Sequence, residues 1–81
     1  MSPAPTASVR GIGPTEFKIA ALAISRMSRR TRLVFLLWSR GRTYDRIAVV
    51  MGISRRRVRR HMLKAIITVD KAAQEVRGRV L

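Results

Sequence analysis

Apolar residues recur at helical spacing in four segments of the chain. The segments run from Glu16 to Arg26, from Arg29 to Arg40, from Tyr44 to Met51 and from Arg55 to Arg77. Within each segment, apolar positions three and four residues apart fall on one face of a helix. The pattern predicts an all-α fold, a small four-helix domain with a C-terminal helix-turn-helix.

Small polar residues and glycines mark the ends of these helices. The predicted N-caps, whose hydroxyl oxygens accept from free amides of the first turn, are Thr15, Ser28, Thr43 and Ser54. Gly41 is predicted to cap the second helix, and Gly52 supplies the positive φ that a sharp turn needs. Residues 1–14 lack periodicity and are expected to form a flexible tail, residues 15–77 the helical domain, and residues 78–81 a frayed end, with packing to about Ala73.

The apolar faces indicate where a core forms. The first helix has two such faces, one formed by Phe17, Ala20, Ala21 and Ile24, the other by Ile19, Leu22 and Ala23. In the second helix Val34, Leu37 and Trp38 share a face and are expected in the core, with Leu33 and Leu36 widening it. The last helix turns inward the side chains of Val58, Met62, Ala65, Ile66 and Val69.

The charge balance points to a polyanionic partner. Lys and Arg number 18 against 4 acidic residues, which gives a formal net charge of +14. Nucleic acid is the first partner that such an excess predicts, and an anionic membrane surface the second. All but three of the basic residues are Arg, whose planar fork matches phosphates and guanine edges.

The start of the last helix is the predicted DNA-reading element. Candidate base contacts are Arg55, Arg56, Arg57, Arg59 and Arg60. They lie in the first two turns, the end that enters the major groove in helix-turn-helix docking. Like charges four residues apart oppose helix formation, as do cations at a helix N-terminus. We expect an anionic ligand to offset both penalties. A solvated basic face with no ligand is the alternative.

Hydroxyl and basic side chains nearby are candidates for contacts with the DNA backbone. The predicted phosphate contacts are Arg42, Thr43, Tyr44, Ser54 and Lys64. Tyr44 could equally pack on the last helix. If 6–10 phosphates are neutralised, affinity should fall by roughly 10³–10⁵ between 50 and 200 mM salt. His61, the single histidine, is expected on a flank of the last helix near a phosphate.

The sequence contains no motif for catalysis, for a cofactor or for a metal ion. Its four acidic residues are scattered and form no pair, and no Ser-His-Asp set or phosphate-cradling glycine loop is visible. The absence of Cys excludes thiolate metal sites and fits a cytoplasmic, nucleoid-associated protein. We therefore expect no enzyme, no catalytic residue, no cofactor and no metal. No apolar run reaches the length of a membrane span, so no membrane-spanning helix is expected. The preferred interpretation includes no membrane partner.

The combination of these motifs resembles region four of bacterial sigma factors, most closely the extracytoplasmic-function type. The first block of that family, L-P-x-R-x-R-x-V-F-L-L, is matched by Arg30, Arg32, Val34, Phe35, Leu36 and Leu37. The second block, G-x-[ST]-Y-x-x-I-A-x-x-x-G-I-S, is matched by Gly41, Thr43, Tyr44, Ile47, Ala48, Gly52, Ile53 and Ser54. The third block is matched by Val58, Met62, Lys64 and Ala65. Ser28 replaces the usual Pro, and the shorter Leu37–Gly41 connection is similar to that of response-regulator output domains.

The resemblance implies a stand-alone helix-turn-helix domain that binds duplex DNA through its last helix. It also implies contact with the flap of the RNA polymerase β subunit through apolar surface on the earlier helices. Candidates for that partner surface are Leu33, Leu36 and Trp38. Arg56 stands where some members carry an acidic base-contacting residue, so the family's DNA consensus is not transferred. The sequence has no counterpart of region two, so we expect it to read DNA for another component to act upon.

Three functions remain open at this point. The first is a sequence-specific transcription regulator. The second is an interaction protein that binds polymerase or an anti-sigma-like partner and has only non-specific DNA affinity. The third is a membrane-active cationic helix protein, which would leave the turn at Gly52 and Ser54 without a purpose. The sequence does not define the oligomeric state or the DNA target.

Overall fold

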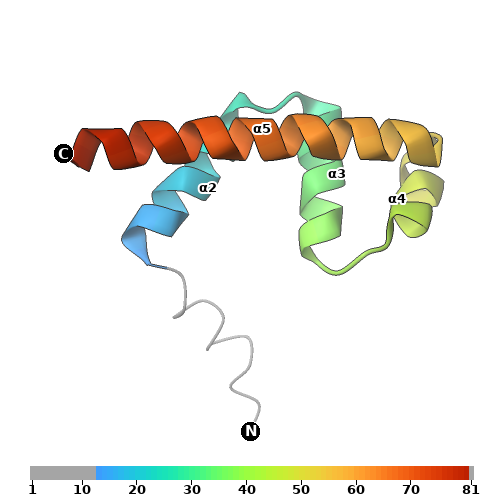
Figure 1. The fold of residues 1–81 in the computed structure, drawn as a ribbon. Helices are drawn as coiled ribbons and strands as arrows, with labels where there is room; N and C mark the ends of the chain where they lie inside the picture. Colours follow the sequence, from blue (N-terminus) through green and yellow to red (C-terminus); the bar gives the residue numbers. More distant parts are fainter. Residues whose placement is uncertain (1–12, 81) are drawn as a thin grey trace, which may run out of the picture.

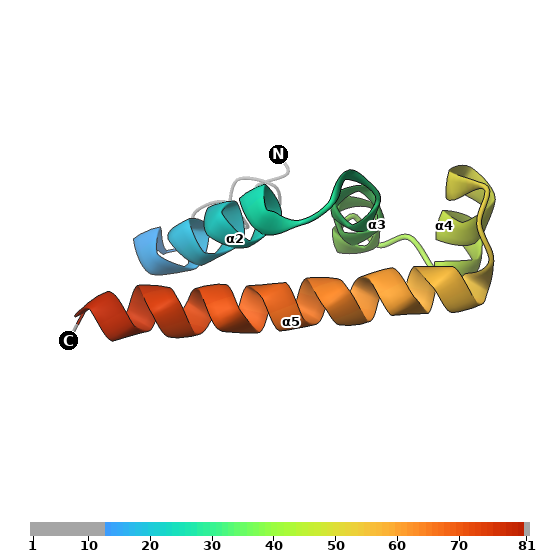
Figure 2. The same ribbon diagram turned by 90° about the horizontal axis from the view of Figure 1, so that it is seen from above.

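The computed structural model describes residues 13–80, and four helices account for most of them. They are α2 (Pro14–Arg26), α3 (Arg29–Ser39), α4 (Tyr44–Met51) and α5 (Arg55–Val80). The long α5 runs the length of the domain, and the other three helices pack against it (Figure 1). In the view from above, α2, α3 and α4 all lie on one side of α5 (Figure 2). The predicted all-α, four-helix architecture is confirmed.

Three of the four predicted N-caps are present. The hydroxyl oxygen of Ser28 accepts from the Thr31 amide at 3.3 Å, that of Thr43 from the Arg46 amide at 3.2 Å, and that of Ser54 from the Arg57 amide at 3.2 Å. These bonds satisfy amides that the first turn of each helix leaves without an intrahelical partner.

The prediction that Thr15 caps the first helix is wrong. Gly13 is the N-cap, and the helix begins at Pro14. Proline suits the first helical position because its φ is already helical and its missing amide hydrogen would have no partner there. The rest of the predicted tail, residues 1–12, lies outside the described residues.

The last helix is longer than predicted. It continues to Val80 rather than ending at Arg77, and it remains packed beyond Ala73, because Val76 contacts the core. Gly78 does not end it, since among the described glycines only Gly41 and Gly52 have a positive φ. Leu81 lies outside the described residues.

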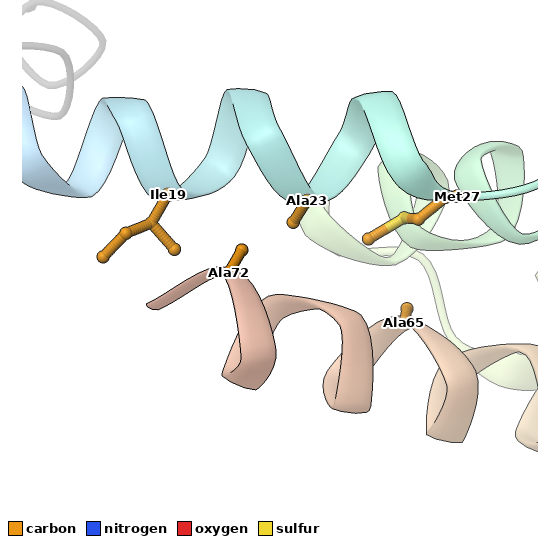
Figure 3. Packing of buried hydrophobic residues seen from close by; sticks show 5 residues of the cluster. All are labelled: Ile19, Ala23, Met27, Ala65 and Ala72. Carbon is orange, nitrogen blue, oxygen red and sulfur yellow. The ribbon is translucent and has the colours of Figure 1, made fainter. Parts of the chain in front are cut away.

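The core consists of two clusters placed one after the other along α5. The first cluster joins α2 to the middle and the C-terminal half of α5 and contains Ile19, Ala23, Met27, Ala65 and Ala72 (Figure 3). The second cluster joins α3 and α4 to the start of α5 and contains Val34, Ile47, Val58 and Met62. Phe35 packs against both clusters and connects them.

Several predicted core positions lie at the surface. In α2 the buried face is that of Ile19 and Ala23, whereas Phe17 is 67 % exposed. In α3, Val34 is buried and Trp38 is 47 % exposed, and in α5 Ile66 is 55 % exposed. The reason is common to all three. Each helix has more apolar positions than one neighbour can cover, and the side facing the neighbouring helix is the side that becomes buried.

Candidate nucleic-acid interface

The turn between α4 and α5 sets the geometry of the helix-turn-helix. Gly52 adopts φ 68° and ψ 33°, the left-handed conformation that glycine adopts without steric cost. The amide of Ile53 donates to the carbonyl of Ala48 at 3.1 Å, and Ser54 then caps α5. The chain thereby reverses from α4 into α5 within a few residues, as the turn chemistry predicts.

The predicted base-contacting arginines are all exposed, and they extend from one flank of α5 to the other. Every side chain of this set is exposed, namely Arg55, Arg56, Arg57, Arg59 and Arg60. Val58, which lies within the run, is completely buried, and Met62 is 2 % exposed. Helical spacing therefore turns the apolar residues toward α3 and α4 and leaves the guanidinium groups exposed. Figure 2 shows that the other three helices all lie on one side of α5.

One of these arginines is positioned by an acidic residue. The Nη1 atom of Arg55 lies 3.5 Å from Oδ1 of Asp45, in the first turn of α4. Both side chains are well exposed, at 63 % and 75 %, so water and salt screen the pair. The contact brings the beginnings of α4 and α5 together and offsets positive charge at the N-terminus of α5.

The predicted phosphate contacts occupy different environments. Thr43 and Ser54 accept from backbone amides as caps, and each hydroxyl hydrogen remains free to donate to an anion. Arg42 and Lys64 are exposed. Tyr44 is half-buried against the second core cluster, which favours the alternative that it packs on the fold.

His61 takes part in an interaction that the sequence did not reveal. Its Nδ1 atom lies 2.8 Å from Oγ1 of Thr31, a buried residue of α3, and Oγ1 accepts from the Ser28 hydroxyl at 3.0 Å. Burial lowers the pKa of His61, and the positive charges of Lys64, Arg30, Arg57 and Arg60 lower it further. One feature of the sequence could have indicated this bond. Thr31 is a polar residue three positions before Val34, so it lies on the face of α3 that becomes buried and needs a polar partner there.

Arg32 has a structural role. Its guanidinium group donates to the carbonyl oxygens of Ile24 at 3.1 Å and Met27 at 3.3 Å. These carbonyls lie at the end of α2, where basic side chains satisfy both hydrogen bonding and the helix dipole. Arg32 therefore fixes the connection between α2 and α3 and is occupied within the fold.

The predicted partner surface on α3 is exposed but divided between two faces. Leu33 is 44 % exposed and Leu36 37 %, and both line a hollow of about 200 Å³ together with Leu37 and Arg40. Trp38 lines a second hollow, of about 440 Å³, whose other lining residues are Phe35, Ile66, Val69, Asp70 and Ala73. The rings of Phe35 and Trp38 are 6.1 Å apart between centroids and form one wall of it.

Comparison with protein families decides the assignment of this helix-turn-helix. Residues 23–67, more than half of the chain, match the family described as sigma-70, region 4. The chain belongs to the sigma-70 region 4 family. The matched residues contain all of α3 and α4, the turn at Gly52 and the arginine-rich start of α5. Comparisons with curated proteins and with solved structures found no match.

Sigma-70 region 4 is a DNA-binding helix-turn-helix module associated with sigma factors, and it is not an enzyme fold. Within residues 13–80, no group of three or more histidine and acidic side chains could hold a metal ion. Over the same range, no helix combines the length and the apolar character required to span a bilayer.

Proposed function

We propose that this region 4 domain is a sequence-specific, DNA-binding transcription regulator of the extracytoplasmic-function type. The first two turns of α5 enter the major groove, where Arg55, Arg56, Arg57, Arg59 and Arg60 reach base edges. Arg42, Thr43, Ser54 and Lys64 contact phosphates, with Tyr44 beside them. The protein acts in the cytoplasm on nucleoid DNA.

The observation that carries this proposal is the separation of charge and apolar surface at the start of α5. Five exposed arginines are held on a helix whose other side is anchored by completely buried Val58. Among the described residues near them, Asp45 is the acidic group that forms an ion pair, and its partner is Arg55. The remaining guanidinium groups stand on a rigid element with their bidentate donors directed outward, which suits guanine N7 and O6.

A gel-shift assay with duplex DNA tests the proposal. Replacing Arg55, Arg59 and Arg60 by Ala should reduce duplex affinity by at least 10-fold, since each good bidentate pair contributes roughly 1–3 kcal/mol of discrimination. The matched control replaces Lys71 and Arg77, which are exposed in the C-terminal half of α5, and should change affinity far less. Unchanged binding by the triple variant would falsify the assignment.

Selection of bound duplexes from a random pool tests sequence specificity separately. A regulator that reads bases should enrich one short motif, and each mismatch in it should cost roughly 1–3 kcal/mol. Uniform recovery of all sequences would contradict specific readout and favour an accessory role for the domain on DNA.

A second candidate function is binding to RNA polymerase, through its β flap, or to an anti-sigma-like partner. The exposed Leu33, Leu36 and Trp38 and the hollow of about 440 Å³ beside Trp38 favour it. Large aromatic and leucine side chains exposed beside a hollow are typical of protein interfaces. Co-purification of polymerase should be lost with Trp38→Ala or Leu36→Ala and retained in the arginine variants. Retention in all variants would exclude this surface as the contact.

A further inference from the structure

A second cluster of basic groups lies on the flank of α5 opposite the Asp45–Arg55 pair. Arg57, His61 and Lys64 are spaced by four and three residues, so they share one face of α5. The hydrogen bond from His61 to Thr31 places the N-terminal turn of α3 beside that face and brings Arg30 next to it. Cationic side chains from two helices therefore converge around one imidazole.

The second ring nitrogen of His61 is available to a ligand. Thr31 occupies Nδ1, and no described residue bonds Nε2. Among the described residues, every buried side-chain nitrogen and oxygen atom has a hydrogen-bond partner. Since Nε2 has none, it is in contact with solvent. The ring carries a hydrogen on Nε2 when it is protonated, and also in the neutral tautomer that has its hydrogen there. In both forms Nε2–H can donate to a ligand.

A hollow adjoins this cluster on the same side of α5. Its volume is about 320 Å³, and its lining residues are Arg26, Met27, Ser28, Thr31, Lys64, Ile67 and Thr68. The lining contains no acidic side chain. The charged groups that face His61 are Arg30 from α3 and Arg57, Arg60 and Lys64 from α5, and all of them are cationic. Arg26 is paired with Glu75, and the four cations around His61 give this flank a positive charge that suits an anion.

We propose that Arg30, His61 and Lys64 form a binding site for a backbone phosphate of the DNA strand on this flank of α5. A helix in the major groove has one sugar-phosphate strand on each side, and phosphate contacts fix its register. The beginning of α4 contacts phosphates of one strand, and this cluster contacts a phosphate of the other. The inference rests on the proposed function. It adds Arg30 to the interface and gives His61 a defined phosphate-binding atom, Nε2.

A phosphate at this site makes duplex binding depend on pH. Burial favours the neutral ring of His61 in the free domain and so lowers its pKa, and the surrounding cations act in the same direction. A phosphate oxygen at Nε2 favours the imidazolium instead, so the pKa of His61 rises on binding and the complex takes up a proton. Thr31 serves both forms, because its hydroxyl can donate to neutral Nδ1 or accept from protonated Nδ1–H. Duplex affinity should therefore increase as the pH falls.

Fluorescence anisotropy with a mixed-sequence duplex tests the site. Affinity is measured between about 50 and 200 mM salt and between about pH 5 and pH 8, for the wild type, Arg30→Ala, His61→Gln and the control Lys71→Ala. Arg30→Ala should lower the slope of log affinity against log salt by about 0.9, the loss of one phosphate contact. In the wild type, affinity should rise by up to about 10-fold per pH unit on acidification, the limit for one linked proton. His61→Gln should abolish that rise.

The outcomes separate the two proposals. Arg30 and Lys71 are both exposed, so neither substitution threatens folding, and circular dichroism confirms helix content for each variant. If the wild type binds duplex but Arg30→Ala has the same salt slope as Lys71→Ala, the phosphate site is wrong and the proposed function stands. A pH dependence unchanged in His61→Gln also overturns the site. If the wild type binds no duplex at either salt limit, both proposals fail.

Discussion

The two halves of α5 are stabilised in different ways. The N-terminal half packs through larger side chains, Val58 and Met62, against Val34 and Ile47. Further along the helix, α5 packs against α2 through Ala65 near its middle and Ala72 in its C-terminal half, where Ala23 allows the helices to approach closely (Figure 3). Larger buried side chains contribute more transfer free energy per residue. On α5 itself, the larger buried side chains therefore lie in the half where clustered arginines oppose folding.

The two halves also differ in charge and in their relation to the family. The N-terminal half carries the arginine run, whereas the C-terminal half contains Asp70 and Glu75. Glu75 accepts from both terminal nitrogens of Arg26, with Nη2 2.9 Å from Oε1, and so ties α5 to the end of α2. The family match ends at residue 67, within α5. The helix-turn-helix formed by α4 and the start of α5, which we call the reading unit, therefore lies within the family match. The first core cluster also contains residues outside the match, Ile19 and Ala72.

The strongest test of this comparison is removal of a side chain from the second cluster. Ile47 is completely buried, so Ile47→Ala leaves a cavity between α4 and α5 and should lower the free energy of unfolding by about 2–5 kcal/mol. Chemical denaturation followed by circular dichroism measures the loss. Val49→Ala is the matched control, because Val49 is 74 % exposed on the same helix. A loss below about 1 kcal/mol for Ile47→Ala would show that the second cluster is not the main core.

Overfilling the first cluster should have a smaller effect and leave DNA binding intact. Ala72 is completely buried where α2 approaches α5, so Ala72→Leu should destabilise the domain by about 1–3 kcal/mol by separating the helices. Ala20→Leu, on the exposed side of α2, should be nearly neutral. Duplex affinity under folding conditions should match that of the wild type. Loss of affinity in folded Ala72→Leu would mean that the reading unit depends on α2.

Local chemistry made one part of this fold predictable from the sequence. Thr43, Gly52 and Ser54 act through hydrogen bonds and dihedral angles within a few residues of themselves, so the turn and both of its helix boundaries could be predicted correctly. The arginine run needed one further fact, the period of the helix, because buried Val58 fixes which side faces the core.

The remaining features depend on contacts between distant segments. Both apolar faces of α2 fit a helix equally well, and the choice of Ile19 over Phe17 follows from where α5 presents Ala72. Trp38 has core spacing, but α3 is covered only on the Val34 side. The Thr31–His61 bond requires the crossing of α3 over α5, which no local pattern encodes. The sequence predicted phosphate contacts at Lys64 and near His61, but the addition of Arg30 from α3 required this tertiary contact.

A cap on the reading unit provides a test of intermediate size. Thr43→Ala removes the acceptor for the Arg46 amide and should cost about 1 kcal/mol of unfolding free energy. Thr43→Ser keeps the hydroxyl oxygen and should retain most of that stability. Thermal denaturation of the three proteins in parallel checks the order. Equal stability of the Ala and Ser variants would contradict a capping role for Thr43.

The smallest expected effect is the pH dependence of stability that His61 confers on the N-terminal half of α5. Its pKa is lower in the folded domain than in the unfolded chain, chiefly through burial. The unfolded state therefore binds the proton more readily, so this contribution is fully present above the ordinary histidine pKa of about 6.5 and is lost as the pH falls toward the folded value. Urea denaturation across this range should show decreasing stability in the wild type, and the histidine contribution should vanish in His61→Gln. Acid should thus weaken the free domain while it tightens the DNA complex. If the loss of stability in acid were the same in the wild type and in His61→Gln, the lowered pKa of His61 would not contribute to it.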